Sequence, residues 1–251
     1  MLLLVIGVAV AIAALAHTAP FPFALDALHA DRVTWRMPRR DGPPMVYLTF
    51  DDGPNPTVTP ALLDLLAAEK VPATFFLIER HITPQTEPLV RRIATEGHAI
   101  GLHSHTRKKM VMAPAELAAT LTRFAAHVEG ITGRPSCRAF RPHAGWRSST
   151  MLDALERIDY QLIGWGFMLW DFDLFRPRSV RIVPRLLRYT SSGDIIVIHD
   201  GDHVNPRADR QYAIDVTRVL IPALREKGFA FGTICTESLE QAAAPRLPRT
   251  D

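Results

Sequence analysis

Short apolar runs alternate with helical segments along this chain, and that alternation limits the folds open to it. The apolar runs that predict strands lie at 45–50, 73–78, 98–103, 138–141, 161–169, 194–199 and 229–234. Helical periodicity occupies the intervals at 59–70, 87–96, 114–129, 148–159, 179–189 and 209–227. Strands that alternate with helices pair in parallel, so the order predicts an α/β fold of seven β/α units.

The strands themselves indicate which α/β architecture to expect. The run from Ile195 to Ile198 is apolar at every position, as a strand buried on both faces requires. A barrel and a doubly wound open sheet both bury strands in this way. No GxGxxG follows the first strand, so the dinucleotide-binding open sheet lacks its main support. We therefore expect a distorted, incomplete (β/α)7 barrel, with its chemistry at the C-terminal ends of the strands.

The N-terminus predicts export. The first 16 residues carry no charge and end in Ala14-Leu15-Ala16, which suits a signal peptidase. As a helix they would span about 24 Å, short of the roughly 30 Å hydrocarbon core, although continuation toward Leu25 would give a tilted anchor. We expect a signal peptide or membrane anchor at 1–24, a linker at 25–44, the main domain at 45–236 and a tail at 237–251. The domain would then be periplasmic or extracellular, and possible membrane anchoring stays open.

Composition excludes several classes of protein. The 29 Lys and Arg residues and 26 Asp and Glu residues are scattered, which argues against a nucleic-acid partner. Cys137 and Cys235 are the two cysteines, so neither a disulfide-dense scaffold nor a CxxC site is possible. Spacing leaves open whether they pair or remain free buried thiols. Any metal site would need carboxylate and imidazole ligands.

Ionisable residues end five of the seven predicted strands. The first strand runs into Asp51-Asp52-Gly53-Pro54, in which neighbouring side chains of an extended segment point apart, so one carboxylate can bind a cation while the other moves a proton. Turn formation is the plain alternative for that segment alone. The other strand ends carry His103-Ser104-His105, Arg141-Pro142-His143, Trp170-Asp171-Phe172-Asp173 and His199-Asp200. One polar pocket accounts for all of them.

These segments resemble a known family. TFDDGP, GHAIGLHSH, FRP, WDFD and IVIHDG are similar, in order and spacing, to the five motifs of the polysaccharide deacetylases. That family comprises the NodB-homology enzymes of carbohydrate esterase family 4, and the likeness covers roughly 45–234. The resemblance implies the barrel fold named above. It also implies a hydrolase that removes N-acetyl or O-acetyl groups from a cell-wall or other amino-sugar polysaccharide or oligosaccharide, using a divalent metal of the Zn, Co, Ni or Mn type.

The resemblance also implies residue roles. Asp51 resembles the base that deprotonates the attacking water, and Arg141 the arginine that pairs with it. Asp52 is similar to a metal ligand, His199 to the acid for the departing amine, and Asp173 to the carboxylate that orients that histidine. A base, an acid and a metal together supply what amide hydrolysis needs.

Trp170 and Ala144 are candidates for substrate contact. Two of the family's motifs also differ in this chain. Trp170 is similar to an aromatic wall residue, with core packing as its alternative role. Ala144 stands where the family's aromatic residue offers a backbone N–H to the oxyanion, and His143 replaces a proline before it. At the fifth strand, the family's later Asp-Trp falls on Arg176 and Pro177.

The largest departure concerns the metal motif, His-(Ser/Thr)-x-x-His. His103 begins it correctly, but the second histidine position holds Arg107, which has no lone pair to offer a cation. His105 can substitute, since residues i and i+2 of a strand share a face, and His143 is a second candidate. Alternatively, the Arg107 guanidinium fills the vacant space and pairs with Asp52.

Three hypotheses about function follow. The first is a metal-dependent deacetylase with a rearranged ligand set of Asp52, His103 and His105. The second is a hydrolase of the same fold that acts on another amide or ester with weak or no metal. The third is a non-catalytic glycan-binding relative, which the joint presence of a base and an acid argues against. The sequence does not specify the oligomeric state.

Overall fold

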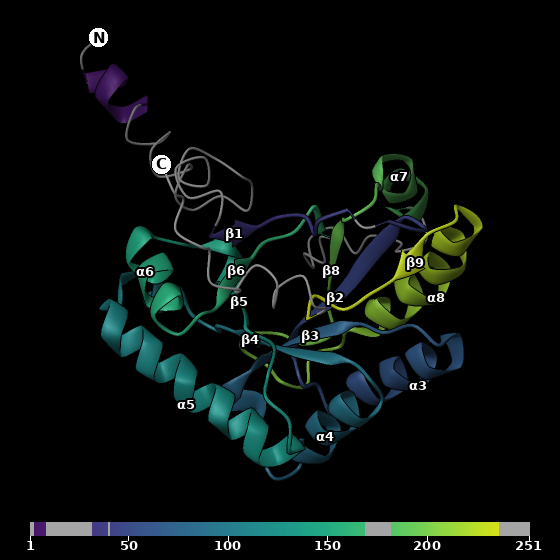
Figure 1. The fold of residues 1–251 in the computed structure, drawn as a ribbon, viewed down its shortest axis with the longest axis horizontal. Helices are drawn as coiled ribbons and strands as arrows, with labels where there is room; N and C mark the ends of the chain where they lie inside the picture. The colour runs from purple at the N-terminus through teal and green to yellow at the C-terminus, as the bar shows by residue number, and fades with distance from the viewer. Residues whose placement is uncertain (1–2, 9–31, 40, 169–181, 236–251) are drawn as a thin grey trace, which may run out of the picture.

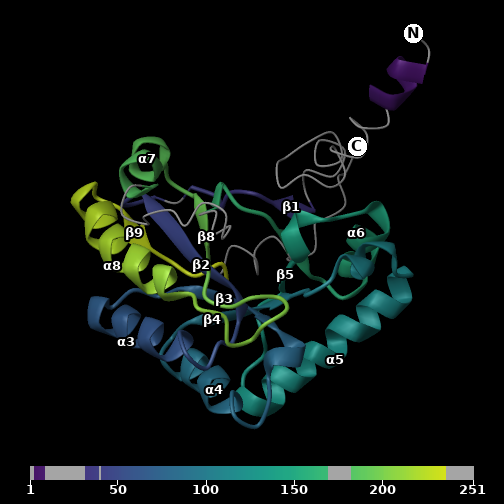
Figure 2. The same cartoon turned by 180° about the vertical axis from the view of Figure 1, so that it is seen from behind.

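The protein is described here by a computed structural model, which covers residues 3–8, 32–39, 41–168 and 182–235. Its described strands form one nine-stranded sheet in the order β1-β6-β5-β4-β3-β2-β8-β7, with β9 paired to β2. Every ladder between these strands is parallel. The sheet curls into a partial barrel, and the helices lie around its outside (Figures 1 and 2). The predicted incomplete barrel is confirmed.

The elements follow the order that the sequence predicts. The strands are β1 Val33–Thr34, β2 Met45–Gly53, β3 Thr74–Ile78, β4 Ala99–His103, β5 Ala139–Arg141, β6 Gln161–Ile163, β7 Phe167–Met168, β8 Ile195–His199 and β9 Ala230–Phe231. The helices are α3 Thr59–Glu69, α4 Glu87–Thr95, α5 Pro114–Thr132, α6 Ser149–Arg157, α7 Ile182–Tyr189 and α8 Gln211–Glu226. Three short 3-10 helices lie at strand ends or in loops: η1 Glu79–His81, η2 Arg107–Val111 and η3 His143–Gly145.

The predicted single strand at 161–169 was wrong, because it is two short strands at opposite ends of the sheet order: β6 lies between β1 and β5, and β7 is the edge strand beside β8. Gly164 and Gly166 lie between β6 and β7. A side chain at Gly164 would collide with the ring of Trp35, and a Cβ at Gly166 would lie 3.1 Å from Asp194 Oδ1. The chain therefore crosses here from one end of the sheet order to the other. We call residues 164–166 the seam.

The domain also begins earlier than the predicted boundary at residue 45. Strand β1 lies inside the predicted 25–44 linker and pairs with β6 through Val33 and Leu162. Beyond it, Arg36 forms a 2.6 Å ion pair with Asp194, and the Met37 N–H donates to the Gly193 carbonyl at 2.8 Å. This segment therefore connects β6 with the residues that precede β8.

The predicted termini lie mostly outside the described residues. Of the signal or anchor segment at 1–24, residues 3–8 are described, and they form a helix with exposed side chains. The tail at 237–251 is outside the described part of the chain. No helix among the described residues is both long and apolar enough to cross a membrane.

Strand β2 shows how alternation divides the core into two faces. Val46, Leu48 and Phe50 belong to the large cluster between the sheet and the helices. Tyr47 belongs to a second cluster inside the barrel. Since side chains alternate along a strand, the next inward position at the end of β2 falls to Asp51. The strand therefore delivers a carboxylate to the interior at its C-terminal end.

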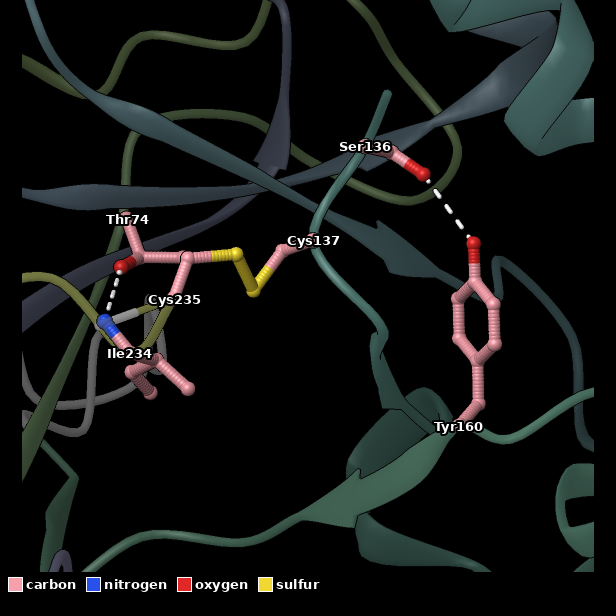
Figure 3. Close-up of a disulfide and its surroundings, with 6 residues drawn as sticks. All are labelled: Thr74, Ser136, Cys137, Tyr160, Ile234 and Cys235. Atoms are coloured by element: carbon pink, nitrogen blue, oxygen red, sulfur yellow. Dashed lines mark hydrogen bonds between the residues drawn. A yellow bond between two sulfur atoms is a disulfide. The ribbon is translucent and has the colours of Figure 1, made fainter. Parts of the chain in front are cut away.

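A disulfide joins Cys137 and Cys235, whose Cα atoms are 5.5 Å apart (Figure 3). Cys137 precedes β5, and Cys235 follows β9. Beside it the Ile234 N–H donates to the Thr74 hydroxyl at 2.9 Å, at the start of β3. The bond therefore holds the last described residues against the end of the barrel opposite the C-terminal strand ends. The sequence left open whether the two cysteines pair or remain free thiols, and in the structure they are paired.

We expect the double variant Cys137→Ser, Cys235→Ser to lose about 4.7 kcal/mol of unfolding free energy, as loop-closure entropy predicts for a loop of about 100 residues. The bond spans 98 residues of sequence, so its removal frees a long loop in the unfolded chain. Urea unfolding of oxidised wild type, reduced wild type and the double variant measures the effect. Reductant should lower the midpoint of the wild type and leave the double variant unchanged. Equal midpoints for all three would contradict the stabilising role.

Candidate active site

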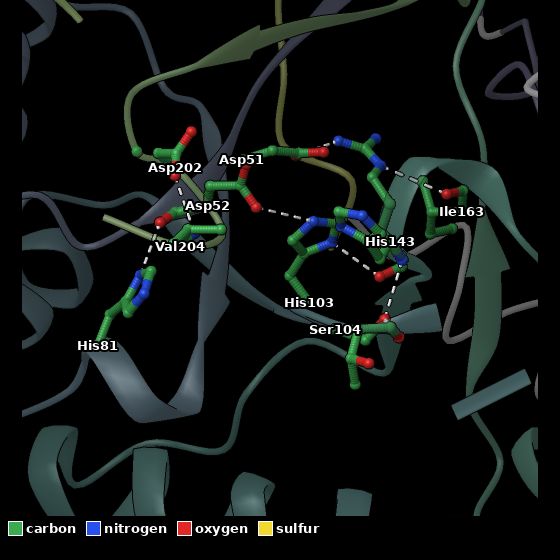
Figure 4. A network of polar contacts seen from close by, with 12 residues as sticks. Asp51, Asp52, His81, His103, Ser104, His143, Ile163, Asp202 and Val204 are labelled. Carbon is green, nitrogen blue, oxygen red and sulfur yellow. Dashed lines mark hydrogen bonds and ion pairs between the residues drawn. The ribbon is translucent and has the colours of Figure 1, made fainter. Parts of the chain in front are cut away.

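The C-terminal ends of four strands bring together five residues that the sequence singled out. Strand β2 supplies Asp51 and Asp52, β4 supplies His103, β5 supplies Arg141 and β8 supplies His199. Strand register places Asp51 opposite His199 and His103 opposite Arg141. Figure 4 shows the two aspartates beside His103. The predicted polar pocket therefore has a common floor built from strand ends.

Asp51 and Arg141 form a buried ion pair. Their side chains are 4% and 0% exposed, and Arg141 Nη1 donates to Asp51 Oδ1 at 2.6 Å. The guanidinium also donates to the Thr49 hydroxyl at 2.8 Å and to the Gly164 carbonyl at 3.1 Å. It lies 4.0 Å from the centre of the Phe76 ring. These contacts balance the Asp51 charge and fix the direction of its carboxylate.

Asp52 and His103 form a second pair with a different character. His103 Nδ1 lies 2.8 Å from the Arg141 carbonyl oxygen, which can only accept, so Nδ1 carries the proton. Nε2 then has the lone pair in the neutral ring, and it faces Asp52 Oδ1 at 3.2 Å. That oxygen is buried and has no hydrogen-bond partner in the described part of the chain. Two lone pairs face each other unless a proton or a cation lies between them.

The pKa values of this pair move in opposite directions. Burial raises the pKa of Asp52, but the neighbouring His103 lowers it well below its usual range. Burial lowers the pKa of His103, while the charges of Asp51 and Asp52 outweigh that effect and raise it. In the absence of a metal, a proton therefore belongs between the two side chains. A cation bound there would displace it.

Asp52 and His103 have the chemistry of two ligands of a divalent metal of the zinc type. A carboxylate oxygen and a neutral imidazole nitrogen are common ligands of such ions, and the carbonyl of Arg141 fixes the ring as a second-shell partner would. However, the described residues contain no group of three His, Cys, Asp or Glu side chains placed to hold a metal. The third ligand is therefore not assembled in this arrangement.

The structure does not bring His105 into a group with Asp52 and His103. His105 lines a pocket of about 220 Å³ together with His103, Arg80 and Lys109. Burial and then the positive charges of Arg80 and Lys109 lower the pKa of His105 to about 4. Strand β4 ends at His103, so the strand alternation on which the i and i+2 prediction relied does not extend to His105.

Arg107 does not pair with Asp52 among the described residues, which corrects the alternative drawn from the sequence. Its guanidinium lies 4.7 Å from the centre of the Trp146 ring, and the residue is exposed at the start of η2. The aromatic ring follows η3, in the neighbouring loop. The arginine therefore packs against an aromatic ring and not against the carboxylate.

His143 is the loop imidazole that lies beside the pair. Its backbone N–H donates to the Ser104 hydroxyl at 2.9 Å, and its ring centre is 4.5 Å from that of His203. Burial, followed by the charges of His103 and His203, lowers its pKa to about 4, against an opposing effect of Asp52. Figure 4 shows His143 next to His103. The sequence analysis missed His203, although it stands four residues after His199.

The remaining predicted site residues are only partly described. Asp173 and Trp170 lie outside the described residues. Ala144 is exposed in η3 with a left-handed φ of 50°, one residue after His143. The His199 backbone N–H donates to the Tyr212 hydroxyl, which in turn donates to the His199 carbonyl, each at 3.0 Å. Helix α8 thus fixes the backbone of His199.

Asp200, which the sequence placed at a strand end without assigning it a role, is a buried carboxyl next to the site. It is 0% exposed and accepts a hydrogen bond from the Thr59 hydroxyl. A Cβ at Gly53 would lie 2.9 Å from its Oδ2, so glycine makes room for it. Burial raises the pKa of Asp200 to about 7, with the charges of Asp52 and Asp51 adding to the effect and the Thr59 bond opposing it. The sequence feature that could have identified Asp200 is its position directly after the buried strand β8.

The comparisons with known proteins agree on one family. Residues 39–163 match the family model described as polysaccharide deacetylase. The chain is 31% identical over 204 residues to a peptidoglycan-N-acetylglucosamine deacetylase of Bacillus cereus, covering 80% of this chain and 91% of the relative. It is 32% identical to a chitooligosaccharide deacetylase of Azorhizobium caulinodans over 193 residues, 74% of this chain and 90% of the relative.

A solved structure shows the same fold. The crystal structure of a peptidoglycan N-acetylglucosamine deacetylase, in complex with 4-naphthalen-1-yl-N-oxidanyl-benzamide, superposes with a TM-score of 0.71 at 25% identity. The match covers 84% of this chain and 94% of that chain. The parallel, curled sheet with outer helices is therefore common to both proteins.

We expect Asp200→Asn to remove part of the pH dependence of stability. The folded pKa of about 7 lies above the ordinary value of 3.8, so the folded protein binds more protons between those values. Wild-type stability should therefore fall as pH rises from 4 to 7, by about 4 kcal/mol at 1.36 kcal/mol for each pKa unit. Asparagine still accepts from Thr59 but does not ionise.

Urea unfolding of both proteins at intervals from pH 4 to pH 8 measures this difference. The variant should gain on the wild type as pH rises and should be the more stable protein at pH 8. Parallel stability curves would contradict the assignment of a raised pKa to Asp200.

Proposed function

Because the chain belongs to the polysaccharide deacetylase family, we propose that it is a hydrolase that removes N-acetyl groups from an amino-sugar polysaccharide. The observation that carries the proposal is the pair of adjacent carboxylates with separate partners. Asp51 is bound to Arg141, and Asp52 faces His103. One carboxylate is thereby available as a base while the other is available to a cation.

Asp51 is proposed as the general base. One of its oxygens is bound by Arg141, which leaves the other to accept a proton from water. Arg141 is the residue that holds this base in place. Its own carbonyl orients His103, so one residue arranges both halves of the site.

Asp52 and His103 are proposed to hold a divalent metal. Neither His143 nor His105 is grouped with this pair among the described residues, and we propose that metal binding recruits His143 as the third ligand. A metal held by these residues would supply the Lewis acid that polarises the scissile carbonyl and the attacking water. His143 lies two residues after Arg141, which is the register partner of His103. The charge of Asp52 also raises the pKa of His143, opposing the effect of burial. The charges that act on His105 are those of Arg80, Lys109, His81 and His103.

His199 is proposed as the general acid. Its strand register pairs it with Asp51 on the neighbouring strand, so the proposed base and acid lie at the same strand ends. Proton transfer from its ring to the departing amine completes the cleavage, since the amine is a poor leaving group without that proton. The orienting role of Asp173 and the wall role of Trp170 remain predictions. The Ala144 backbone N–H is proposed as the oxyanion donor.

N-acetylglucosamine is proposed as the sugar that is deacetylated. One relative acts, by its name, on peptidoglycan N-acetylglucosamine and the other on chitooligosaccharide. Export to the periplasmic or extracellular side is proposed with it. The uncharged N-terminal run and the Cys137–Cys235 disulfide support that location, since disulfides persist in oxidising compartments.

A second candidate is a hydrolase of the same fold that acts with weak metal binding or none. The observation that favours it is the absence of a third ligand grouped with Asp52 and His103 among the described residues. Metal dependence of the reaction separates it from the first candidate.

We expect Asp51→Asn to lower kcat for release of acetate from N-acetylglucosamine oligomers by about 10²-fold or more, the usual range for a general base. The substitution keeps the shape of the side chain and removes the proton acceptor. Acetate release and thermal unfolding should be measured together, with and without added Zn²⁺ or Co²⁺. Turnover close to that of wild type in a folded variant would remove Asp51 from the mechanism. No acetate release by the wild type under any metal would overturn the proposed function.

We expect His143→Ala to weaken Co²⁺ binding as strongly as His103→Ala, about 10-fold or more, and His105→Ala to leave it unchanged. Competition with a chromophoric chelator measures the affinity of each purified variant. Loss of affinity in His105→Ala, with His143→Ala like the wild type, would restore the ligand set read from the sequence.

A further inference from the structure

We propose that His81 is a positioning residue that directs the carboxylate of Asp52 by holding the backbone carbonyl of the same residue. The inference rests on the proposed function, in which Asp52 is a metal ligand. His81 ends η1, directly after β3, and Figure 4 shows it on the far side of Asp52 from His103. It therefore touches the backbone of the ligand and not the site of the cation.

The hydrogen bond of His81 is defined by its acceptor. His81 Nδ1 lies 3.1 Å from the Asp52 carbonyl oxygen, and a carbonyl cannot donate, so Nδ1 carries the proton. The other ring nitrogen, Nε2, is buried and has no hydrogen-bond partner among the residues that the structure describes. Burying a polar atom without a partner costs free energy, yet His81 is only 3% exposed. The bond to Asp52 is what this imidazole provides to the structure.

Asp52 needs such a contact because its carboxylate points against the strand pattern. By alternation, Asp52 would follow Leu48 and Phe50 toward the outer face of the sheet. Its carboxylate instead reaches His103. His103 shares a face of β4 with Gly101, where a Cβ would collide with the ring of Phe76 from the inner cluster.

The backbone of Asp52 produces this reversal. Its φ is 70°, in the left-handed region that a residue with a side chain seldom occupies. The ladder between β2 and β3 also shifts register between Asp51 and Gly53, as in a bulge that re-aims a side chain. A Cβ at Gly201 would overlap the Asp52 carbonyl, so that carbonyl is packed between the loop after β8 and His81. Both neighbours therefore hold the peptide in the unusual conformation.

Two substitutions of His81 separate hydrogen bonding from simple packing. His81→Asn keeps an N–H donor on the atom bonded to Cγ, where Nδ1 stands. His81→Gln is also polar and of similar size, but it places its donor one bond farther out, near the position of Nε2. If donation to the Asp52 carbonyl is the function, asparagine preserves it and glutamine does not.

The matched control is His98→Gln. His98 is also buried, and its Nδ1 accepts from the Ala73 N–H at 3.2 Å, at the opposite end of the sheet from Asp52. Its substitution removes a buried imidazole hydrogen bond without touching the site. A general loss of stability would appear in this variant as well.

Co²⁺ dissociation constants and melting temperatures of the full-length proteins form the first test. We expect His81→Gln to weaken Co²⁺ binding about tenfold or more, in the range of lost second-shell contacts, and His81→Asn to stay within about threefold of wild type. His98→Gln should lower the melting temperature and leave the affinity unchanged. Equal Co²⁺ affinity in His81→Gln and wild type, or an equal loss in His98→Gln, would overturn the positioning role.

Metal-free crystal structures of the wild type, His81→Asn and His81→Gln form the second test, which is independent of metal binding. We expect the Asp52 carboxylate to stay beside His103 Nε2 in wild type and His81→Asn, and to leave it in His81→Gln. A carboxylate that remains in place in His81→Gln overturns the inference. A wild type that binds no Co²⁺ defeats the metal role in the proposed function, and the crystal structures still decide the role of His81.

Discussion

The site depends on a charge pair taken out of water. Asp51 and Arg141 are almost fully buried, and a buried pair is stable only if the remaining donors and acceptors are also satisfied. Arg141 meets that condition by donating to Thr49 and to the carbonyl of Gly164 in the seam. The seam that carries the chain across the open barrel therefore also supplies an acceptor to the guanidinium. Fold closure and placement of the base are parts of one network.

That network extends to the proposed metal ligands through the backbone. The carbonyl of Arg141 fixes the His103 ring so that Nε2 faces Asp52. In the metal-free protein a proton belongs between these groups, and the raised pKa of His103 reflects how strongly the carboxylates retain it. A cation would compete with that proton, so affinity for the metal would rise with pH. The proposed metal site is thus linked to protonation by its own ligands.

The sequence predicted what regular strands determine. Alternating runs fixed the parallel order, and residues at strand ends, such as Asp51, His103 and Arg141, lie together because parallel strands end at one rim. The predictions from periodicity were wrong where the chain leaves regular strand geometry. The crossing at the seam depends on space left by glycines, and His105 lies beyond the last residue of β4, so neither follows from periodicity. The direction of the Asp52 side chain and its contact with His81 depend on the left-handed backbone of Asp52, which sequence periodicity does not predict.

The departures from the family pattern fall on the segments that the ladders do not fix. The base, its arginine, the first imidazole and the proposed acid all belong to β2, β4, β5 and β8, where hydrogen bonds to both neighbours define the backbone. Arg107, His143 and Ala144 belong to the short helices after those strands. A loop can bring another imidazole to the same rim without disturbing a ladder, whereas moving a strand residue would shift every side chain in register with it. The altered ligand motif is therefore compatible with an intact base and acid, because the two sets of residues are held by different parts of the fold.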